Sequence, residues 1–113
     1  MLAQDPIFTT TTRWGVVVLM QGAWDHAVKR HQEIGPYLRE VEQTLIHPNL
    51  VFELPHVLPT KAFYAKGLVS DPRYRDGYVA VIVRCTKEPA FVKTAYLPSR
   101  LAGNLGKLIH AER

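Results

Sequence analysis

The chain has 113 residues and a hydrophobic fraction of 47%, enough to bury one core but not two. This composition excludes a disordered polymer, and the longest apolar run, VVVLM, is far too short to span a bilayer. No secretory signal is expected, because the first residues lack a basic stretch followed by an apolar one. The single cysteine, Cys85, cannot form an internal disulfide, and the end of a strand-like run is an ordinary place for a structural thiol. We therefore expect one soluble, cytoplasmic domain over 1–113, with its core at about 13–96 and a basic tail at 97–113.

Charge is divided unevenly along the chain. The formal net charge is +4, yet residues 1–60 hold four Lys/Arg and six Asp/Glu, a balance of −2, whereas residues 61–113 hold ten and four, a balance of +6. A basic half attracts polyanions. Charge alone does not choose between RNA, DNA and an acidic inhibitor protein, and a solvated basic surface explains it as well; RNA is the partner expected once the motifs below are considered.

The first half of the chain predicts one strand followed by two helices. RWGVVVLM (13–20) is rich in β-branched and apolar residues, as strands are. Gly22 interrupts this run, and AWDHAVKRHQEI (23–34) follows with helical periodicity. The apolar stripe of this helix consists of Trp24, Ala27, Val28 and His31. Gly35 and Pro36 end the helix and begin a second one, PYLREVEQTLIHP (36–48).

The second half predicts antiparallel strands. The strand-like runs are LVFEL (50–54), KAFYAK (61–66), GYVAVIVRC (77–85) and AFVKTAY (90–96). Only the four residues from Thr86 to Pro89 separate the last two runs. They should form a hairpin, because a parallel crossover needs about 12 residues or more.

The connecting segments complete the expected fold. KGLVSDPRYRDG (66–77) is a polar, arginine-bearing loop of the kind that carries ligand contacts. TTTT (9–12) suits an extended lead-in, and RLAGNLGKLI (100–109) a short helix weakened by its glycines. The fold class is therefore α+β: an N-terminal strand and two helices packed against an antiparallel sheet of about four strands.

His31 is the first candidate for chemistry. Its position on the apolar stripe should point the ring towards the sheet, where a half-buried imidazole can serve as general acid or base. The alternative is a core histidine whose ring bonds to a carbonyl group. His26 lies about 140° further round the helix, so the two histidines do not form a metal grip. His47, His56 and His110 lack ligand spacing, and we expect no metal ion and no cofactor.

Strand residues form the second group of candidates. Alternation places Val92, Thr94 and Tyr96 on one face of the last strand and Lys93 on the other. A hydroxyl group can donate a hydrogen bond to phosphate, and a phenol can stack on a base. Thr94 and Tyr96 are therefore candidate phosphate and base contacts.

Basic and aromatic side chains on the neighbouring strands extend this group. Tyr64 and Lys66 share one face of KAFYAK, and Arg84 shares a face with Tyr78 in GYVAVIVRC. These side chains suit nucleic-acid contacts. An ordinary solvated strand face explains each of them equally well.

The order of these motifs resembles a known family. The motifs are WDHAVKRHQEI, LREVEQTLIHPNLVFE, FYAK, GYVAVIV and VKTAY, within a stretch from about Arg13 to Tyr96. In that order they resemble the phage-associated nuclease domains grouped with barnase, EndoU, colicin and RelE ribonucleases. The resemblance implies a metal-independent ribonuclease-like fold, with helices beside an antiparallel sheet and a cleft on or beside that sheet.

The resemblance also implies roles for individual residues. The helix histidine of the family corresponds to His31 in RHQE, and its tryptophan and following histidine correspond to Trp24 and His26. The strand-end hydroxyl and aromatic residues correspond to Thr94 and Tyr96. Two positions depart from the pattern: Gln32 stands where proline is expected, and Lys93 where an apolar residue is usual.

The function expected from the sequence is metal-independent RNA cleavage by a toxin or a phage-derived effector. Such cleavage needs a base for the 2′-hydroxyl proton, an acid for the leaving 5′-oxygen, and cations near the phosphorane. The catalytic candidates are His31, Lys66, Thr94 and Tyr96. The nucleic-acid-binding candidates are Tyr64, Arg84, Lys93 and His26. Two alternatives remain: a non-catalytic module that binds nucleic acid or an acidic protein, and a phage accessory protein that keeps the fold.

Overall fold

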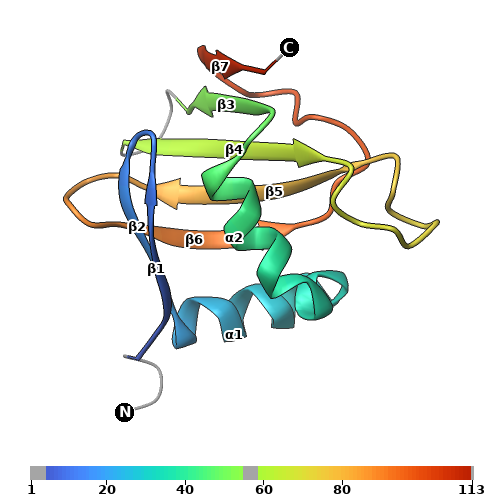
Figure 1. The fold of residues 1–113 in the computed structure, drawn as a ribbon, viewed down its shortest axis with the longest axis horizontal. Coiled ribbons are helices and arrows are strands. Elements are labelled where there is room, and N and C mark those ends of the chain that lie inside the picture. The colour runs from blue at the N-terminus through green and yellow to red at the C-terminus, as the bar shows by residue number, and fades with distance from the viewer. Residues whose placement is uncertain (1–4, 55–58, 113) are drawn as a thin grey trace.

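A seven-stranded mixed sheet forms the centre of the protein (Figure 1). The structure is a computed structural model that describes residues 5–54 and 59–112. The elements in chain order are β1 (Pro6–Thr12), β2 (Gly15–Met20), α1 (Gln21–Arg30), the 3₁₀ helix η2 (Gln32–Tyr37), α2 (Leu38–Ile46), β3 (Leu50–Glu53), β4 (Thr60–Lys66), β5 (Tyr78–Arg84), β6 (Ala90–Tyr96) and β7 (Leu108–Ala111).

The order of strands across the sheet is β1-β2-β6-β5-β4-β3-β7. β2 and β6 pair in parallel, and the other described pairs are antiparallel. The predicted hairpin of β5 and β6 is confirmed. The α+β class is confirmed too, but the prediction of about four antiparallel strands is wrong, since the N-terminal strand joins the sheet beside β6 instead of packing against it.

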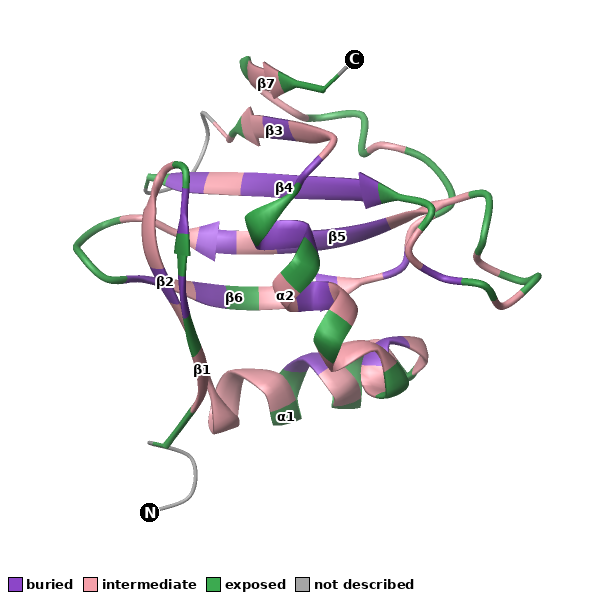
Figure 2. Cartoon of the chain, in the orientation of Figure 1, coloured by how far each residue is buried: buried purple, intermediate pink, exposed green. Residues whose placement is uncertain are grey.

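The helices cover one face of the sheet and one of its margins. In Figure 1, α2 lies in front of β4, β5 and β6, while α1 runs alongside β6. The strand side chains beneath α2 are apolar and fully buried, as the purple stretches of Figure 2 show. This core includes Val51, Phe63, Val79, Val81 and Val83. Burying such a side chain stabilises the fold by about 1.5–3 kcal/mol relative to leaving it in water.

The opposite face of the sheet has its own, smaller cluster. Ala62, Tyr64 and Ala80 are buried there. Leu101 and Leu105, from the segment that follows β6, pack against this cluster. This segment therefore covers part of the face that the helices leave open.

The first helix differs in its ends from the prediction. α1 begins directly after β2, with Gly22 inside it, and it ends at Arg30 instead of Ile34. The stripe is confirmed as far as Val28, because Ala27 is buried and Trp24 and Val28 pack against the core. His31 already has non-helical backbone angles, φ −134° and ψ 76°. Its amide donates to the carbonyl of Ala27 at 2.7 Å, which closes the last helical turn.

The second helix also begins later than predicted. The segment around Pro36 is the 3₁₀ helix η2, and α2 starts at Leu38. Proline has no amide hydrogen to donate and disfavours α geometry in the residue before it, which suits the tighter, shorter element.

Two strands lie where none was predicted. The threonine run belongs to β1, which pairs with β2, and Thr10 and Thr12 are buried. Threonine is β-branched and favours strands despite its polarity. The expected helix at 100–109 is absent: its last residues belong to β7, which pairs with β3.

The molecule has a Cα radius of gyration of 13.1 Å, close to the value of about 13 Å that a compact domain of this length should have. Neither helix within residues 5–54 and 59–112 is long and apolar enough to cross a membrane.

Candidate functional site

His31 and Tyr96 meet at the point where α1 and β6 both end. Their rings are stacked, with centroids 5.1 Å apart and an angle of 28° between the planes. The side chain of His31 remains 32% exposed, so the imidazole keeps access to solvent while it rests on the phenol. Because helix α1 stops at Arg30, His31 is free to leave the helical path and reach round the margin of the sheet.

Tyr64 supports Tyr96 on the same face of the sheet. Tyr64 is fully buried in β4, and its hydroxyl group shares a hydrogen bond with Tyr96. Burial raises the pKa of Tyr64 to about 12, and the Tyr96 phenol adds to this effect. Tyr64 is therefore a neutral, rigid support for Tyr96. It was expected to contact nucleic acid, but its ring is not exposed to a ligand in this structure.

Lys66 and Tyr78 complete the group. They are cross-strand partners at the end of β4 and the start of β5. The Lys66 ammonium lies 4.9 Å from the centre of the Tyr78 ring, and that ring meets Tyr64 edge-on at 5.5 Å. Cation–π contact of this kind holds an exposed lysine in place without neutralising it. We call His31, Tyr64, Lys66, Tyr78 and Tyr96 the His31 cluster.

Alternation explains why strand residues of the His31 cluster share a face. Tyr64 pairs with Ala80, which in turn pairs with Tyr96, and paired residues point to the same side of a sheet. The predicted sharing of one face by Tyr64 and Lys66 agrees with these contacts.

A bulge in β6 changes the orientation of its other candidates. Val83 pairs with Val92 and Ile82 with Thr94, so Lys93 is the extra residue and the register shifts there. Val92 consequently belongs to the core under the helices, while Tyr96 packs in the smaller cluster on the other face. The prediction that Val92, Thr94 and Tyr96 share a face is wrong for Val92.

Three further candidates, Thr94, Arg84 and Lys93, differ in how far they are buried. The hydroxyl oxygen of Thr94 is buried and has no hydrogen-bond partner in the described part of the chain. The same holds for Nε of Arg84. Lys93 is exposed. Of the three, Lys93 is the most exposed, whereas Thr94 and Arg84 are half-buried.

His26 lies apart from the His31 cluster. It is exposed on α1, whereas Trp24 packs against the core. The predicted separation of His26 and His31 around the helix agrees with their different exposure.

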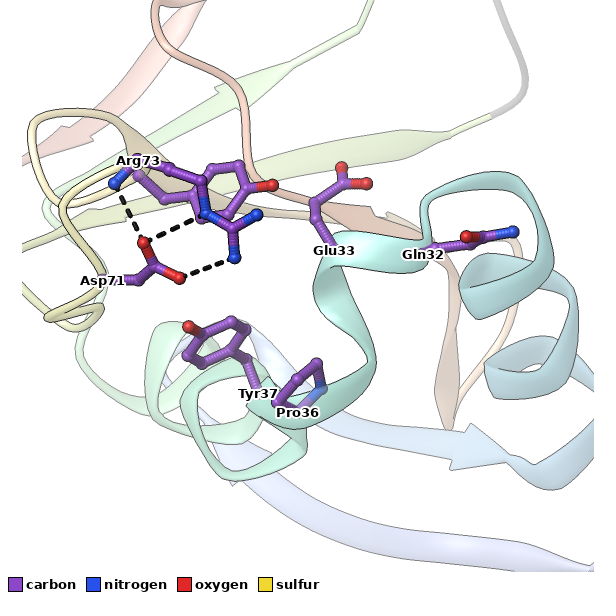
Figure 3. A pocket seen from close by; sticks show the side chains of 7 residues that line it. Gln32, Glu33, Pro36, Tyr37, Asp71 and Arg73 are labelled. Atoms are coloured by element: carbon purple, nitrogen blue, oxygen red, sulfur yellow. Dashed lines mark hydrogen bonds and ion pairs between the residues drawn. The ribbon is translucent and has the colours of Figure 1, made fainter.

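A pocket of about 460 Å³ opens beside His31, between η2 and the loop that joins β4 to β5. Its lining consists of Gln32, Glu33, Pro36, Tyr37, Asp71, Arg73 and Tyr74. We call it the Glu33 pocket. Figure 3 shows Glu33 and Tyr37 on the η2 side and the joined side chains of Asp71 and Arg73 on the loop side. Sequence reasoning singled out this loop but missed Glu33 and Tyr37, because both were assigned to predicted helices and the pocket depends on tertiary contacts with the loop.

The two carboxylates of the Glu33 pocket differ in their bonding partners. Asp71 accepts hydrogen bonds from Arg73 Nε at 3.3 Å and Nη2 at 2.9 Å, and these bonds lower the pKa of the Asp71 carboxyl group. Glu33 lies 4.0 Å from His31 Nδ1 and is 27% exposed. Glu33 thus connects the pocket to the His31 cluster.

The described residues offer neither a set of metal ligands nor a reactive thiol. No set of three or more His, Cys, Asp or Glu side chains within 5–54 and 59–112 is placed to hold a metal ion. His56 lies outside the described residues. Cys85 is half-buried, and burial raises the pKa of its thiol, which disfavours the reactive thiolate.

Comparison with models of protein families, with curated proteins and with solved structures finds no match to this chain.

Proposed function

We propose that the protein is a metal-independent ribonuclease and that the His31 cluster is its catalytic site. The observation that carries the proposal is the stacked, solvent-accessible pair of His31 and Tyr96, with an exposed lysine held on the same tyrosine network. The alternative for this position is a core histidine, sealed from water and bonded to a carbonyl group. His31 instead keeps about a third of its surface in water.

The roles follow from the chemistry of the groups. His31 takes the proton of the 2′-hydroxyl group while water supplies one to the leaving 5′-oxygen, or His31 supplies the second proton while water takes the first, since histidine exchanges protons near neutral pH. The 2′-oxygen attacks phosphorus, the bond to the 5′-oxygen breaks, and a 2′,3′-cyclic phosphate remains. Lys66 stabilises the charge that builds up on the phosphorane. Tyr96 orients the imidazole and offers its phenol edge to the substrate.

Rigid support favours catalysis over binding alone. Buried Tyr64 bonds to Tyr96, on which His31 stacks, and Tyr78 holds Lys66, so both His31 and Lys66 rest on fixed aromatic side chains. Groups that keep their geometry before the substrate arrives lose little free energy to reorganisation. The order of motifs that resembles the ribonuclease group is a second, independent support.

The test is cleavage of single-stranded RNA in the presence of EDTA. We expect cleavage with a 2′,3′-cyclic phosphate product, and resistance at any position that carries a 2′-deoxy sugar. His31→Ala should lower the rate by about 10²–10⁴-fold, the usual loss for a general acid or base.

His26→Ala is the matched control, because His26 stands on the same helix but is exposed and outside the His31 cluster. Its rate should stay close to that of the wild type, and thermal melts should show that both variants fold. Undiminished cleavage by folded His31→Ala would remove His31 from the mechanism. RNA binding without cleavage by the wild type would favour the non-catalytic module.

A further inference from the structure

The Glu33 pocket has a character opposite to that of the basic strands. Its charged lining groups are Glu33, Asp71 and Arg73, of which the last two neutralise each other. What remains is one carboxylate, Glu33, whose recorded contact is His31 at 4.0 Å. A hollow of this kind does not favour a phosphate group, because the free charge is negative. It favours a neutral group that donates hydrogen bonds.

The walls of the Glu33 pocket are aromatic. Tyr37 and Tyr74 both line it. Each ring is half-buried and packs against the core, which restricts its motion. The Arg73 guanidinium lies 5.2 Å from the centre of the Tyr74 ring, which adds a planar cation to the wall. Aromatic rings and guanidinium planes are the surfaces on which unstacked bases rest.

The position of the pocket relates it to the His31 cluster. Gln32 and Glu33 line the pocket and follow His31 directly in the chain. A volume of about 460 Å³ is within the range of small-ligand sites, which hold about 300–1,000 Å³. A base in this hollow would therefore adjoin a phosphate at His31.

We propose that the Glu33 pocket binds one unstacked base of a single-stranded RNA, and that it selects bases with an exocyclic amino group. The inference rests on the proposed function, since it names the substrate of that same site. Glu33 accepts the hydrogen bond of the amino group, and Tyr37 and Tyr74 hold the plane of the base. The acidic pocket takes the base while the basic groups outside it take the phosphate.

The selection follows from the edges of the four bases. Adenine, cytosine and guanine each present an amino group that donates to an acceptor. Uracil presents one N–H between two carbonyl oxygens. A carboxylate that approaches the N–H is therefore repelled by the partial negative charges of both oxygens. A glutamine in place of Glu33 would remove that repulsion, because its amide group donates as well as accepts.

The experiment measures binding, so that it does not depend on cleavage. Cytidine 3′-monophosphate and uridine 3′-monophosphate are titrated into the folded protein by calorimetry. We expect the cytidine compound to bind about tenfold more tightly, the value of one well-placed hydrogen bond to a charged acceptor. Glu33→Gln should bring the two affinities within about threefold, since the repulsion of uracil is lost.

Matched variants separate the pocket from the fold. Glu53→Gln removes an exposed carboxylate on β3 and should keep the wild-type preference. Tyr74→Ala should weaken both nucleotides by about tenfold, the loss of one aromatic stack, whereas Tyr74→Phe should not. Thermal melts must show that each variant folds.

The outcomes distinguish the two proposals. Equal binding of both nucleotides by the wild type, binding of neither, or an unchanged preference in Glu33→Gln would overturn the pocket assignment even if the protein cleaves RNA. Selective binding by a protein that cleaves nothing would leave the pocket standing and overturn the ribonuclease.

Discussion

Tyr64 shows how one buried residue governs the exposed ones around it. Its hydroxyl group is buried and bonds to Tyr96, while its ring meets both Phe52 and Tyr78 edge-on. Buried tyrosines ordinarily find a hydrogen-bond partner for the hydroxyl group. Here the partner is Tyr96, on which His31 rests, so a buried phenol supports the stack at the surface.

The titration of Tyr64 gives the first prediction at this scale. Its pKa is raised from 10.0 to about 12, so the folded protein holds this proton more tightly than the unfolded chain does. The resulting stabilisation is fully present below pH 10 and is lost as the pH rises through about 12. Absorbance of tyrosinate, followed with rising pH, should show one phenol that ionises late.

Tyr64→Phe supplies the comparison. This variant keeps the ring and lacks the hydroxyl group, so the late phenol should vanish from the titration. Its free energy of unfolding should also fall less steeply between pH 10 and 12. A late phenol that persists in Tyr64→Phe would assign the raised pKa to another tyrosine.

At the scale of elements, the hairpin of β1 and β2 depends on a glycine. Gly15 opens β2 with a φ of 118°, which L side chains rarely adopt. A Cβ atom there would lie 2.8 Å from Oε2 of Glu88, whose Oε1 accepts a hydrogen bond from the amide of Val16 at 2.9 Å. The backbone conformation therefore requires glycine, and a Cβ would also push the flexible Glu88 carboxylate away from the Val16 amide.

Gly15→Ala should lower the free energy of unfolding by about 1–3 kcal/mol, the usual cost of one residue held in a disfavoured backbone conformation. Gly103→Ala is the control, because a Cβ at Gly103 would meet nothing within 4 Å, and its effect should stay within about 0.5 kcal/mol. Urea unfolding measures both. Equal stabilities of the two variants would show that the hairpin tolerates a side chain at Gly15.

The elements that sequence reasoning predicted are those with a local signal. The hairpin of β5 and β6 follows from the short loop between two apolar runs, and the helical stripe from Trp24 to Val28 follows from its period. β7 has no such signal, since its partner β3 lies more than 50 residues earlier in the chain. The pairing is decided by tertiary contacts, which a local pattern does not contain.

The candidate site divides along the same line. His31, Lys66 and Tyr96 stood out as types of residue suited to RNA cleavage, and the structure brings His31 onto Tyr96. The stack depends on the helix ending at Arg30, although the apolar period continues to His31. The bulge at Lys93 and the Glu33 pocket depend on loop and register geometry, and alternation alone predicts neither.

At the scale of the whole molecule, the uneven charge has a place in the fold. The first half of the sequence, with a balance of −2, supplies β1 to β3 and all the helices. The second half, with a balance of +6, supplies β4 to β7. His31, the proposed proton carrier, comes from the first half and stacks on Tyr96, which belongs to the basic half. In the proposed mechanism, substrate attraction and proton transfer therefore come from different parts of the chain.

This division predicts how RNA binding depends on salt. Each lysine that neutralises a phosphate of a single strand releases counterions and contributes about 0.7 to the slope of log K against log salt concentration. Lys66 and Lys93 are exposed on β4 and β6, close to the proposed site. Lys66→Ala or Lys93→Ala should therefore reduce the magnitude of the slope by about 0.7 each, measured between about 50 and 200 mM salt with inactive His31→Ala protein. Lys107→Ala removes an exposed lysine beside β7, at the opposite edge of the sheet, and should leave the slope as it is.

If all three variants reduce the slope equally, RNA follows the general charge of the molecule and not the strands beside His31. If RNA binding does not change with salt at all, the basic half does not contact phosphate.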